Sequence, residues 1–254
     1  METPLLYIVL GAAGSGRRRV IADLIRDGLG DTSRVHVLVA GSEAEAPGEV
    51  SERLAAAGRV SVGAWTLDEA GRLVAEIPEG VTEVFILADG RADPVDQIEA
   101  VHGWLPSSGL QLGRVLTVLN CRLAVDQPGV ARWHDACIHF SDVVILANRE
   151  GVPNKWISDF QGRLRKAHFP CLVEMTRKAG FANAAALLEP QARRISLFFD
   201  DPEEWPEIDE EELLPGETLD LVGKEDPYIE RTPAGRRAIE LPDIRRFLGP
   251  LPEV

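Results

Sequence analysis

The 254-residue sequence predicts an α/β protein with a doubly wound, mostly parallel sheet and an acidic, proline-rich C-terminal tail. The first observation is a set of short runs that are apolar at nearly every position, as in strands buried on both faces: 5–10, 35–40, 81–87, 114–119, 142–147, 171–175 and 194–199. The second is that helical patterns separate them, long enough for right-handed crossovers: 17–28, 49–57, 67–76, 95–104, 128–139, 155–167 and 181–189.

The composition excludes several classes of protein. Hydrophobic residues make up 45% of the chain, enough for one sizeable core, so neither a disordered nor a disulfide-stapled chain is expected. Cys121, Cys137 and Cys171 lie far apart and form no CxxC pair. This usage fits a reducing compartment, and we expect a cytoplasmic protein.

Charge and hydropathy bear on the expected partners. No run of eighteen apolar residues occurs, and the N-terminal METPLLYIVLG has neither a basic region nor a small-residue cleavage site. The net charge of −14 opposes binding to nucleic acid or to an anionic membrane. We therefore expect no nucleic acid and no membrane as partners.

The acidity is concentrated near the C-terminus, which divides the chain into a main domain, 1–199, and a tail, 200–254, without an independent domain. Residues 200–212, DDPEEWPEIDEEE, hold nine acids and no base, and two prolines interrupt any helix, so an extended linker is predicted. Beyond it, apolar residues and basic pairs favour a tail packed on its own domain over a motif for a partner. For Trp205, packing within the chain is likewise favoured over anchoring a partner.

The turn after the first predicted strand carries the strongest chemical signal. Strand, glycine-rich loop and helix form the geometry of a phosphate cradle, in which backbone N–H groups and a helix N-terminus stabilise an anion. The loop predicted to bind phosphate or nucleotide consists of Gly11, Ala12, Ala13, Gly14, Ser15, Gly16, Arg17 and Arg18.

The loop departs from the GxxxxGK(S/T) motif at its two chemical positions. Gly11 and Gly16 match the glycines, but Arg17 stands at the lysine position and Arg18 at the hydroxyl position. That hydroxyl ligates magnesium in the motif, whereas a guanidinium has no lone pair to donate and repels the cation. Arg17 can still contact a phosphate with two N–H groups.

Two other interpretations of the loop remain open. It can be a tight turn whose glycines serve packing, with arginines on a solvated helix start. It can also belong to a dinucleotide-binding fold, with Glu43 after the second strand as the acceptor for ribose hydroxyls. This second alternative is weakened because Arg19 replaces the glycine that lets helix and strand pack closely.

Three later segments resemble CobW-like GTPases, relatives of the urease and hydrogenase nickel-insertion proteins UreG and HypB. FILADGRADPVDQIEAV resembles the family's ETTGLADPxPV stretch, RVLTVLNCRLA resembles its VVTVVDA strand, and HFSDVVILANREGVPN resembles its ADVVLLNKTDLV strand. The segments occur in family order after the loop, and the resemblance covers roughly residues 4–195. It implies a P-loop GTPase fold, with GTP as a candidate ligand.

The resemblance also assigns roles to single residues. Gly90 retains the glycine of the family's ExxG motif, and Asn148 matches the asparagine that ties the base-recognition loop to the phosphate loop. Asp93 followed by Pro94 also fits a simple helix cap, and we favour that structural role for the pair.

At other positions this sequence lacks the functional side chains of the family. The acidic ExxG position falls on Leu87, and Asp89 lies two residues too late to replace it simply. The guanine-reading aspartate falls on Gly151, which offers no acceptor. Residues 58–67 contain no thiol in place of the family's CxCC, so handling of nickel, cobalt or zinc through that site is unsupported.

Two further groups of residues favour structural roles. His134 and Cys137 share one helical face, with Asp135 and His139 nearby, but two plausible ligands on one face are too few for a metal site. Cys121, at the end of a predicted strand, is expected to be a packed small residue rather than a nucleophile.

The leading hypothesis is a degenerate GTPase-like protein with weak or no GTP hydrolysis that acts as a scaffold, regulator or assembly protein, through self-association or with a protein partner. It predicts no catalytic residue, no bound metal and no certain cofactor. One alternative is a divergent GTP- or ATP-binding protein in which Arg17 and Arg18 replace lysine and magnesium. A further alternative is an NAD(P)-dependent oxidoreductase.

Overall fold

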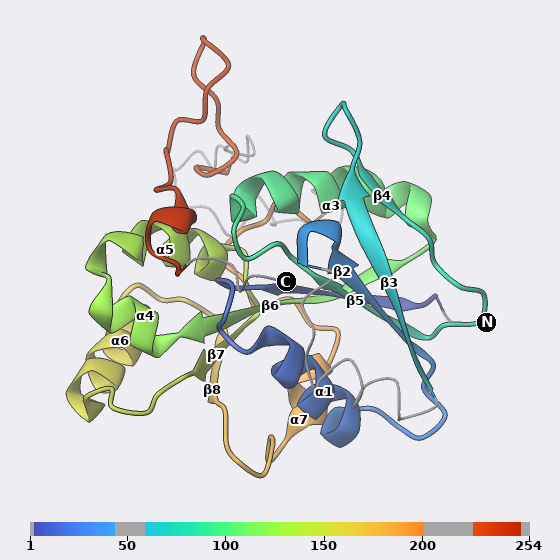
Figure 1. The fold of residues 1–254 in the computed structure, drawn as a ribbon, viewed down its shortest axis with the longest axis horizontal. Helices are drawn as coiled ribbons and strands as arrows, with labels where there is room; N and C mark the ends of the chain where they lie inside the picture. The colour runs from blue at the N-terminus through green and yellow to red at the C-terminus, as the bar shows by residue number, and fades with distance from the viewer. Residues whose placement is uncertain (1–2, 44–58, 201–225, 250–254) are drawn as a thin grey trace, which may run out of the picture.

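A computed structural model describes residues 3–43, 59–200 and 226–249, which fold around one central sheet (Figure 1). Eight strands follow the order β4-β3-β2-β5-β1-β6-β7-β8. They are β1 (Leu5–Leu10), β2 (Val35–Ala40), β3 (Val60–Leu67), β4 (Leu73–Ala75), β5 (Glu83–Leu87), β6 (Gln111–Asn120), β7 (Val143–Ala147) and β8 (Leu172–Met175). All neighbouring pairs are parallel except β3 with β4, so the doubly wound, mostly parallel α/β fold is confirmed.

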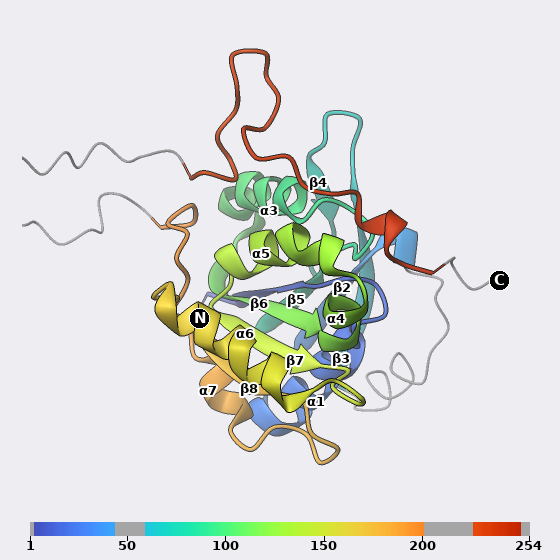
Figure 2. The same cartoon turned by 90° about the vertical axis from the view of Figure 1, so that its left-hand side faces the viewer.

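Helices cover both faces of the sheet. They are α1 (Arg17–Gly28), α3 (Pro94–Ser108), α4 (Cys121–Asp126), α5 (Ala131–His139), α6 (Asn154–Lys166) and α7 (Ala184–Leu188), with short 3-10 turns η1 (Gly41–Glu43), η2 (Pro128–Val130) and η5 (Ile244–Arg246). Figure 2 shows α3 and α5 on one side of the sheet and α1 and α7 on the other. Apolar side chains of β1 accordingly alternate between two large buried clusters.

The central position of β1 fixes the place of the glycine loop. β1 pairs with β5 on one side, Val9 opposite Leu87, and with β6 on the other, Leu10 opposite Thr117. The loop that follows Leu10 therefore emerges between the carboxyl ends of two strands. In open parallel sheets this edge, where strand order reverses, is where ligands bind.

Two predicted elements are wrong. The run 194–199 forms no strand, because Ser196 bonds the carboxylate of Asp226 and Phe198 packs on the ring of His102. The predicted helix 67–76 is instead a hairpin between β3 and β4, since Asp68 accepts hydrogen bonds from the backbone N–H groups of the turn, which Gly71 closes at φ +74°.

The other elements lie close to their predicted ranges, with two additions. β3 and α4 were not predicted: β3 lies near the edge of the sheet and exposes most of its side chains, and α4 begins directly at the end of β6. The predicted helix 49–57 and the acidic linker with Trp205 lie outside the described residues.

Residues 226–249, called the C-terminal strap, pack on the outside of α3 and α5, as the intramolecular interpretation expects (Figure 2). Arg237 forms ion pairs with Asp96 and Glu99 of α3. Ile244 is fully buried in the core cluster on this side of the sheet. Within the part of the chain that the structure describes, no helix combines the length and hydropathy needed to cross a membrane.

Candidate functional site

The loop between β1 and α1 has the glycine conformations that the predicted phosphate cradle requires. Gly11 has φ +135°, and a Cβ there would overlap the carbonyl oxygen of Val118, so only glycine fits. Gly16 caps α1 in the left-handed region at φ +89°, and no side chain caps the helix. The partial positive charge of the first turn of α1 therefore remains at this edge of the sheet.

The guanidinium of Arg17 lies inside this edge rather than in solvent. Arg17 is 5% exposed and donates to the carbonyl of Ala88, just after β5. Its Nη2 also donates to both carboxylate oxygens of Glu43, at 2.8 and 3.0 Å. The side chain at the motif's lysine position is thus occupied by a carboxylate from the same chain.

Glu43 ties a second segment to the same point. Its Oε1 accepts a hydrogen bond from the backbone N–H of Gly90 at 2.9 Å, and Arg18 donates to its backbone carbonyl. The side chain is 12% exposed. The carboxylate therefore bridges the start of α1 and the turn after β5.

Gly90 presses against the loop itself. Its carbonyl accepts from the N–H of Ala13 at 3.0 Å, and a Cβ at Gly90 would overlap that nitrogen and the Arg17 guanidinium. The N–H of Ser15 bonds the carbonyl of Ala12 at 3.1 Å. Two of the loop's N–H groups are therefore engaged inside the protein, and the retained glycine allows the close approach.

Among the described residues, the hydroxyl of Ser15 is fully buried without a hydrogen-bond partner. A Cβ on Gly11 would lie 3.2 Å from it, so the hydroxyl faces the backbone of the preceding turn.

The position of the lost acidic residue is apolar and closed. Leu87 is fully buried, and its carbonyl accepts from the indole N–H of Trp65 at 2.9 Å. The nearby carboxylate of Asp89 accepts instead from Ser42 and from the N–H of Arg91, each at 2.8 Å. Asp89 thus holds its own turn and does not replace the missing side chain.

The asparagine contact implied by the family resemblance is present. Asn148 Nδ2 donates to the carbonyl of Gly14 at 3.1 Å, which ties the loop after β7 to the loop after β1. Asn148 adopts φ +50°, a conformation that asparagine tolerates better than most residues. At the lost guanine-reading position, Gly151 has φ +74°, and a Cβ there would lie 2.9 Å from Arg122.

Asp93 and Pro94 have the helix-capping role that was favoured. Asp93 caps α3 by accepting from the N–H of Val95 at 2.8 Å, with Pro94 at the first helical position. Burial lowers the pKa of His134 to about 4 and raises the pKa of Cys121 to about 11. Residues 3–43, 59–200 and 226–249 contain no group of three or more His, Cys, Asp or Glu able to hold a metal.

The structure thus brings Arg17, Arg18 and Gly90 of the predicted set to one point, and Asn148 to the loop beside it. The sequence did not predict that Glu43 connects Arg17 with Gly90. Glu43 entered only as an acceptor for ribose, yet its carboxylate already holds Arg17 and the N–H of Gly90. The one sequence signal was its place just after β2, at the same edge of the sheet.

Comparison with known proteins gives distant structural similarity only. The sequence matches no protein-family model and no curated protein at a significant level. The structure is similar to the zinc-bound YjiA GTPase from E. coli, with 12% identity, 76% of this chain and 67% of that chain covered, and a TM-score of 0.46. It is also similar to cell division protein FtsY from Thermotoga maritima, with 15% identity, 79% and 70% covered, and a TM-score of 0.43.

Proposed function

We propose that this chain is a degenerate P-loop GTPase-like protein that acts as a non-catalytic scaffold or regulator, its phosphate loop closed by an ion pair within the chain. The observation that carries the proposal is the contact of Arg17 with Glu43 at 2.8 Å, at the point where the motif's lysine would meet a phosphate. The carboxylate of Glu43 already neutralises the guanidinium of Arg17 that would otherwise contact the phosphate.

The energies favour the closed loop. A phosphate would have to displace Glu43 from Arg17 and from the N–H of Gly90. Because the phosphate would replace one anion by another on Arg17, its gain is offset by the charged hydrogen bonds that Glu43 loses, each worth about 1.5–3 kcal/mol, against the roughly 8 kcal/mol of micromolar binding. Neither Leu87 nor Arg18 offers an oxygen to magnesium, so the metal that neutralises charge during phosphoryl transfer has no support here.

The first experiment is a binding panel with the purified full chain. GTP, ATP, NADPH and inorganic phosphate are each tested with and without magnesium by thermal shift and calorimetry. We expect no stabilisation, whereas a ligand present at 100 times its Kd adds about 2.7 kcal/mol. Magnesium-dependent GTP binding, or GTP hydrolysis above the rate in buffer, would contradict the proposal.

The same panel separates the two alternatives. A divergent nucleotide-binding protein that uses Arg17 and Arg18 binds GTP or ATP without magnesium in its unmodified form. An oxidoreductase binds NADPH, although Glu43 is already engaged with Arg17. Under our proposal, magnesium-independent binding of phosphate appears only after Glu43→Gln removes the competing charge and leaves Arg17 in place.

A further inference from the structure

The last strand of the sheet, β8, has an open edge beside α6. Among the described residues β8 pairs only with β7. The N–H of Leu172 points toward β7, because it donates to the carbonyl of Asp142 at 2.9 Å. Backbone groups of successive strand residues point to opposite sides, so the N–H and C=O of Val173 point outward. β8 therefore offers an edge to which a further strand can be added.

Glu174 closes the far half of this edge. Its Oε1 accepts from the N–H of Met175 at 2.9 Å, which is the next outward-pointing donor after Val173, and lies 3.8 Å from Arg177. Charged side chains are a common means of blunting an exposed strand edge. Pairing with a further strand is thereby confined to the part of β8 around Val173.

A groove of about 260 Å³ lies between this part of β8 and the second half of α6. It is called the α6–β8 groove and is lined by Gln161, Leu164, Arg165, Phe169, Cys171 and Val173. Cys171 and Val173 are two residues apart, so they share the face of β8 that packs with Leu164 of α6. The groove thus combines an apolar surface with an open strand edge.

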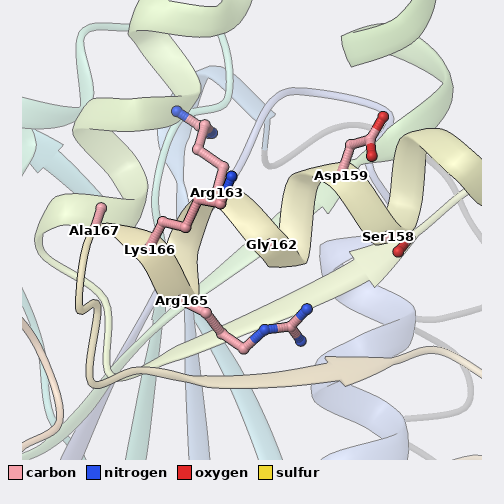
Figure 3. A pocket seen from close by; sticks show the side chains of 7 residues that line it. All are labelled: Ser158, Asp159, Gly162, Arg163, Arg165, Lys166 and Ala167. Atoms are coloured by element: carbon pink, nitrogen blue, oxygen red, sulfur yellow. The ribbon is translucent and has the colours of Figure 1, made fainter.

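Arg165 carries the one charge among the described residues that line the groove. It forms no salt bridge within 3–43, 59–200 and 226–249, and a Cβ on Gly162 would lie 4.0 Å from its Nη2. Arg163 differs, since it pairs with Asp135 of α5 at 2.8 Å, and Figure 3 shows it leaving α6 in another direction. Lys166 lines only the adjoining hollow on α6, which Arg165 shares. An anionic group in the groove therefore has Arg165 as its partner.

We infer that the α6–β8 groove binds an extended peptide of a partner protein by strand addition. The peptide carries an apolar residue and a carboxylate two positions apart, because such side chains share one face of a strand. Its backbone pairs with Val173, its apolar side chain contacts Leu164 and Phe169, and its carboxylate pairs with Arg165. The inference is independent of the proposed function, because no residue of the glycine loop takes part.

A second copy of this chain fits the groove less well. The one acid of its β8 is Glu174, which alternates with Cys171 and Val173 and so faces away from α6. The carboxylate of Glu174 is also engaged with the N–H of Met175. The net charge of −14 further opposes the approach of two copies.

The experiment uses the full chain and the peptide Ac-TETLTET-NH2. A glutamate lies two positions from the leucine on each side, so either strand direction satisfies the pattern. In an NMR titration we expect the amide of Val173 to shift, with a Kd below about 1 mM. The peptides Ac-TKTLTKT-NH2 and Ac-TETSTET-NH2 should bind about tenfold more weakly. Net charge alone predicts the reverse order for the lysine peptide, since the protein is acidic.

Arg165→Glu tests the charge contact by exchange. We expect it to weaken binding of Ac-TETLTET-NH2 about tenfold and to strengthen binding of Ac-TKTLTKT-NH2, a gain that a misfolded variant cannot give. Arg236→Glu makes the same charge change at an exposed position of the C-terminal strap and should leave both affinities unchanged.

Any of four results overturns the inference. No binding at about 5 mM peptide would mean that the groove takes no added strand. Equal affinities for the glutamate and lysine peptides would remove the role of Arg165. Shifts confined to residues outside α6 and β8 would place the peptide elsewhere. Dimers in sedimentation that dissociate as the peptide is added would assign the groove to a second copy.

Discussion

Two buried arginine–carboxylate pairs lie at opposite ends of the sheet. Arg17 and Glu43 meet at the carboxyl edge, 5% and 12% exposed. Arg194 and Asp142 meet where β7 begins, 4% and 0% exposed. Both pairs join an arginine to a carboxylate, but their surroundings give the two pairs different roles.

The difference lies in what else each carboxylate holds. Asp142 also accepts from the backbone N–H groups of Val115 and Arg193, at 2.7 and 2.6 Å, so it is built into the sheet and the following chain. Glu43 accepts from one backbone N–H, that of Gly90, beside a glycine loop shaped for an anion. The Asp142 pair joins segments within the sheet, whereas the Glu43 pair lies where we propose a vestigial phosphate site.

The largest expected effect is at the joining pair. Asp142→Ala leaves Arg194 buried without its carboxylate partner and two backbone donors without an acceptor, and we expect a loss of about 3–5 kcal/mol in unfolding free energy. Urea denaturation followed by circular dichroism measures it. Asp159→Ala, which breaks only the exposed pair with Lys155, is the control and should change stability by less than about 0.5 kcal/mol.

Glu43→Gln tests the other pair. We expect a loss of about 1.5–3 kcal/mol, because hydrogen bonds to a charged partner are weakened while the shape is kept. Phosphate at millimolar concentration should restore part of this loss, since the freed Arg17 accepts an anion. Phosphate should not restore the stability of Asp142→Asn. If phosphate stabilises both variants equally, the two ion pairs do not differ in their ability to make way for an anion.

Gly90→Ala tests how closely the turn after β5 approaches the loop. A Cβ would overlap the N–H of Ala13, so we expect a loss of about 1–3 kcal/mol in unfolding free energy. Gly103→Ala is the matched control, because no atom lies within 4 Å of its new Cβ inside α3. There we expect a gain of about 0.5–1 kcal/mol, and a loss at both positions would indicate a general intolerance of alanine.

The smallest effect is expected at the joint with the C-terminal strap, and it depends on pH. Burial alone would raise the pKa of Asp226, but hydrogen bonds from His139 and Ser196 lower it below 3.8. A lowered folded pKa stabilises the fold above that value and is lost as the pH falls through it. Asp226→Asn should therefore cost about 1 kcal/mol near pH 6 in urea denaturation, and the difference should shrink below pH 3.8.

A control for the pH effect is the exposed pair of Asp243 with Arg245. Asp243→Asn should change stability by less than about half as much as Asp226→Asn, since its partner Arg245 is 69% exposed and asparagine can keep the hydrogen bond from the N–H of Arg245. A pH-independent loss for Asp226→Asn would instead mean that packing of the strap, rather than the carboxylate charge, is responsible.

The local sequence pattern was sufficient to predict an element whose own residues determine its structure. Buried runs such as 142–147 predict strands because both faces are covered, and Asp93 with Pro94 predicts a helix start because the cap bonds its own next turn. The hairpin of β3 and β4 was missed because β3 exposes most of its side chains and has no continuous apolar run. The run 194–199 looked like a strand, yet Ser196 and Phe198 contact single residues of other segments while Ile195 and Leu197 are exposed.

The sequence by itself determined the alternation of strands and helices, the glycine loop after β1 and the replacement of lysine and hydroxyl by Arg17 and Arg18. These are properties of neighbouring residues. Only the tertiary structure decided what Arg17 does, because its partner Glu43 lies 26 residues away and reaches it only when β1, β2 and β5 are placed side by side. Ion pairs between distant residues depend on the sheet order, which local periodicity does not encode.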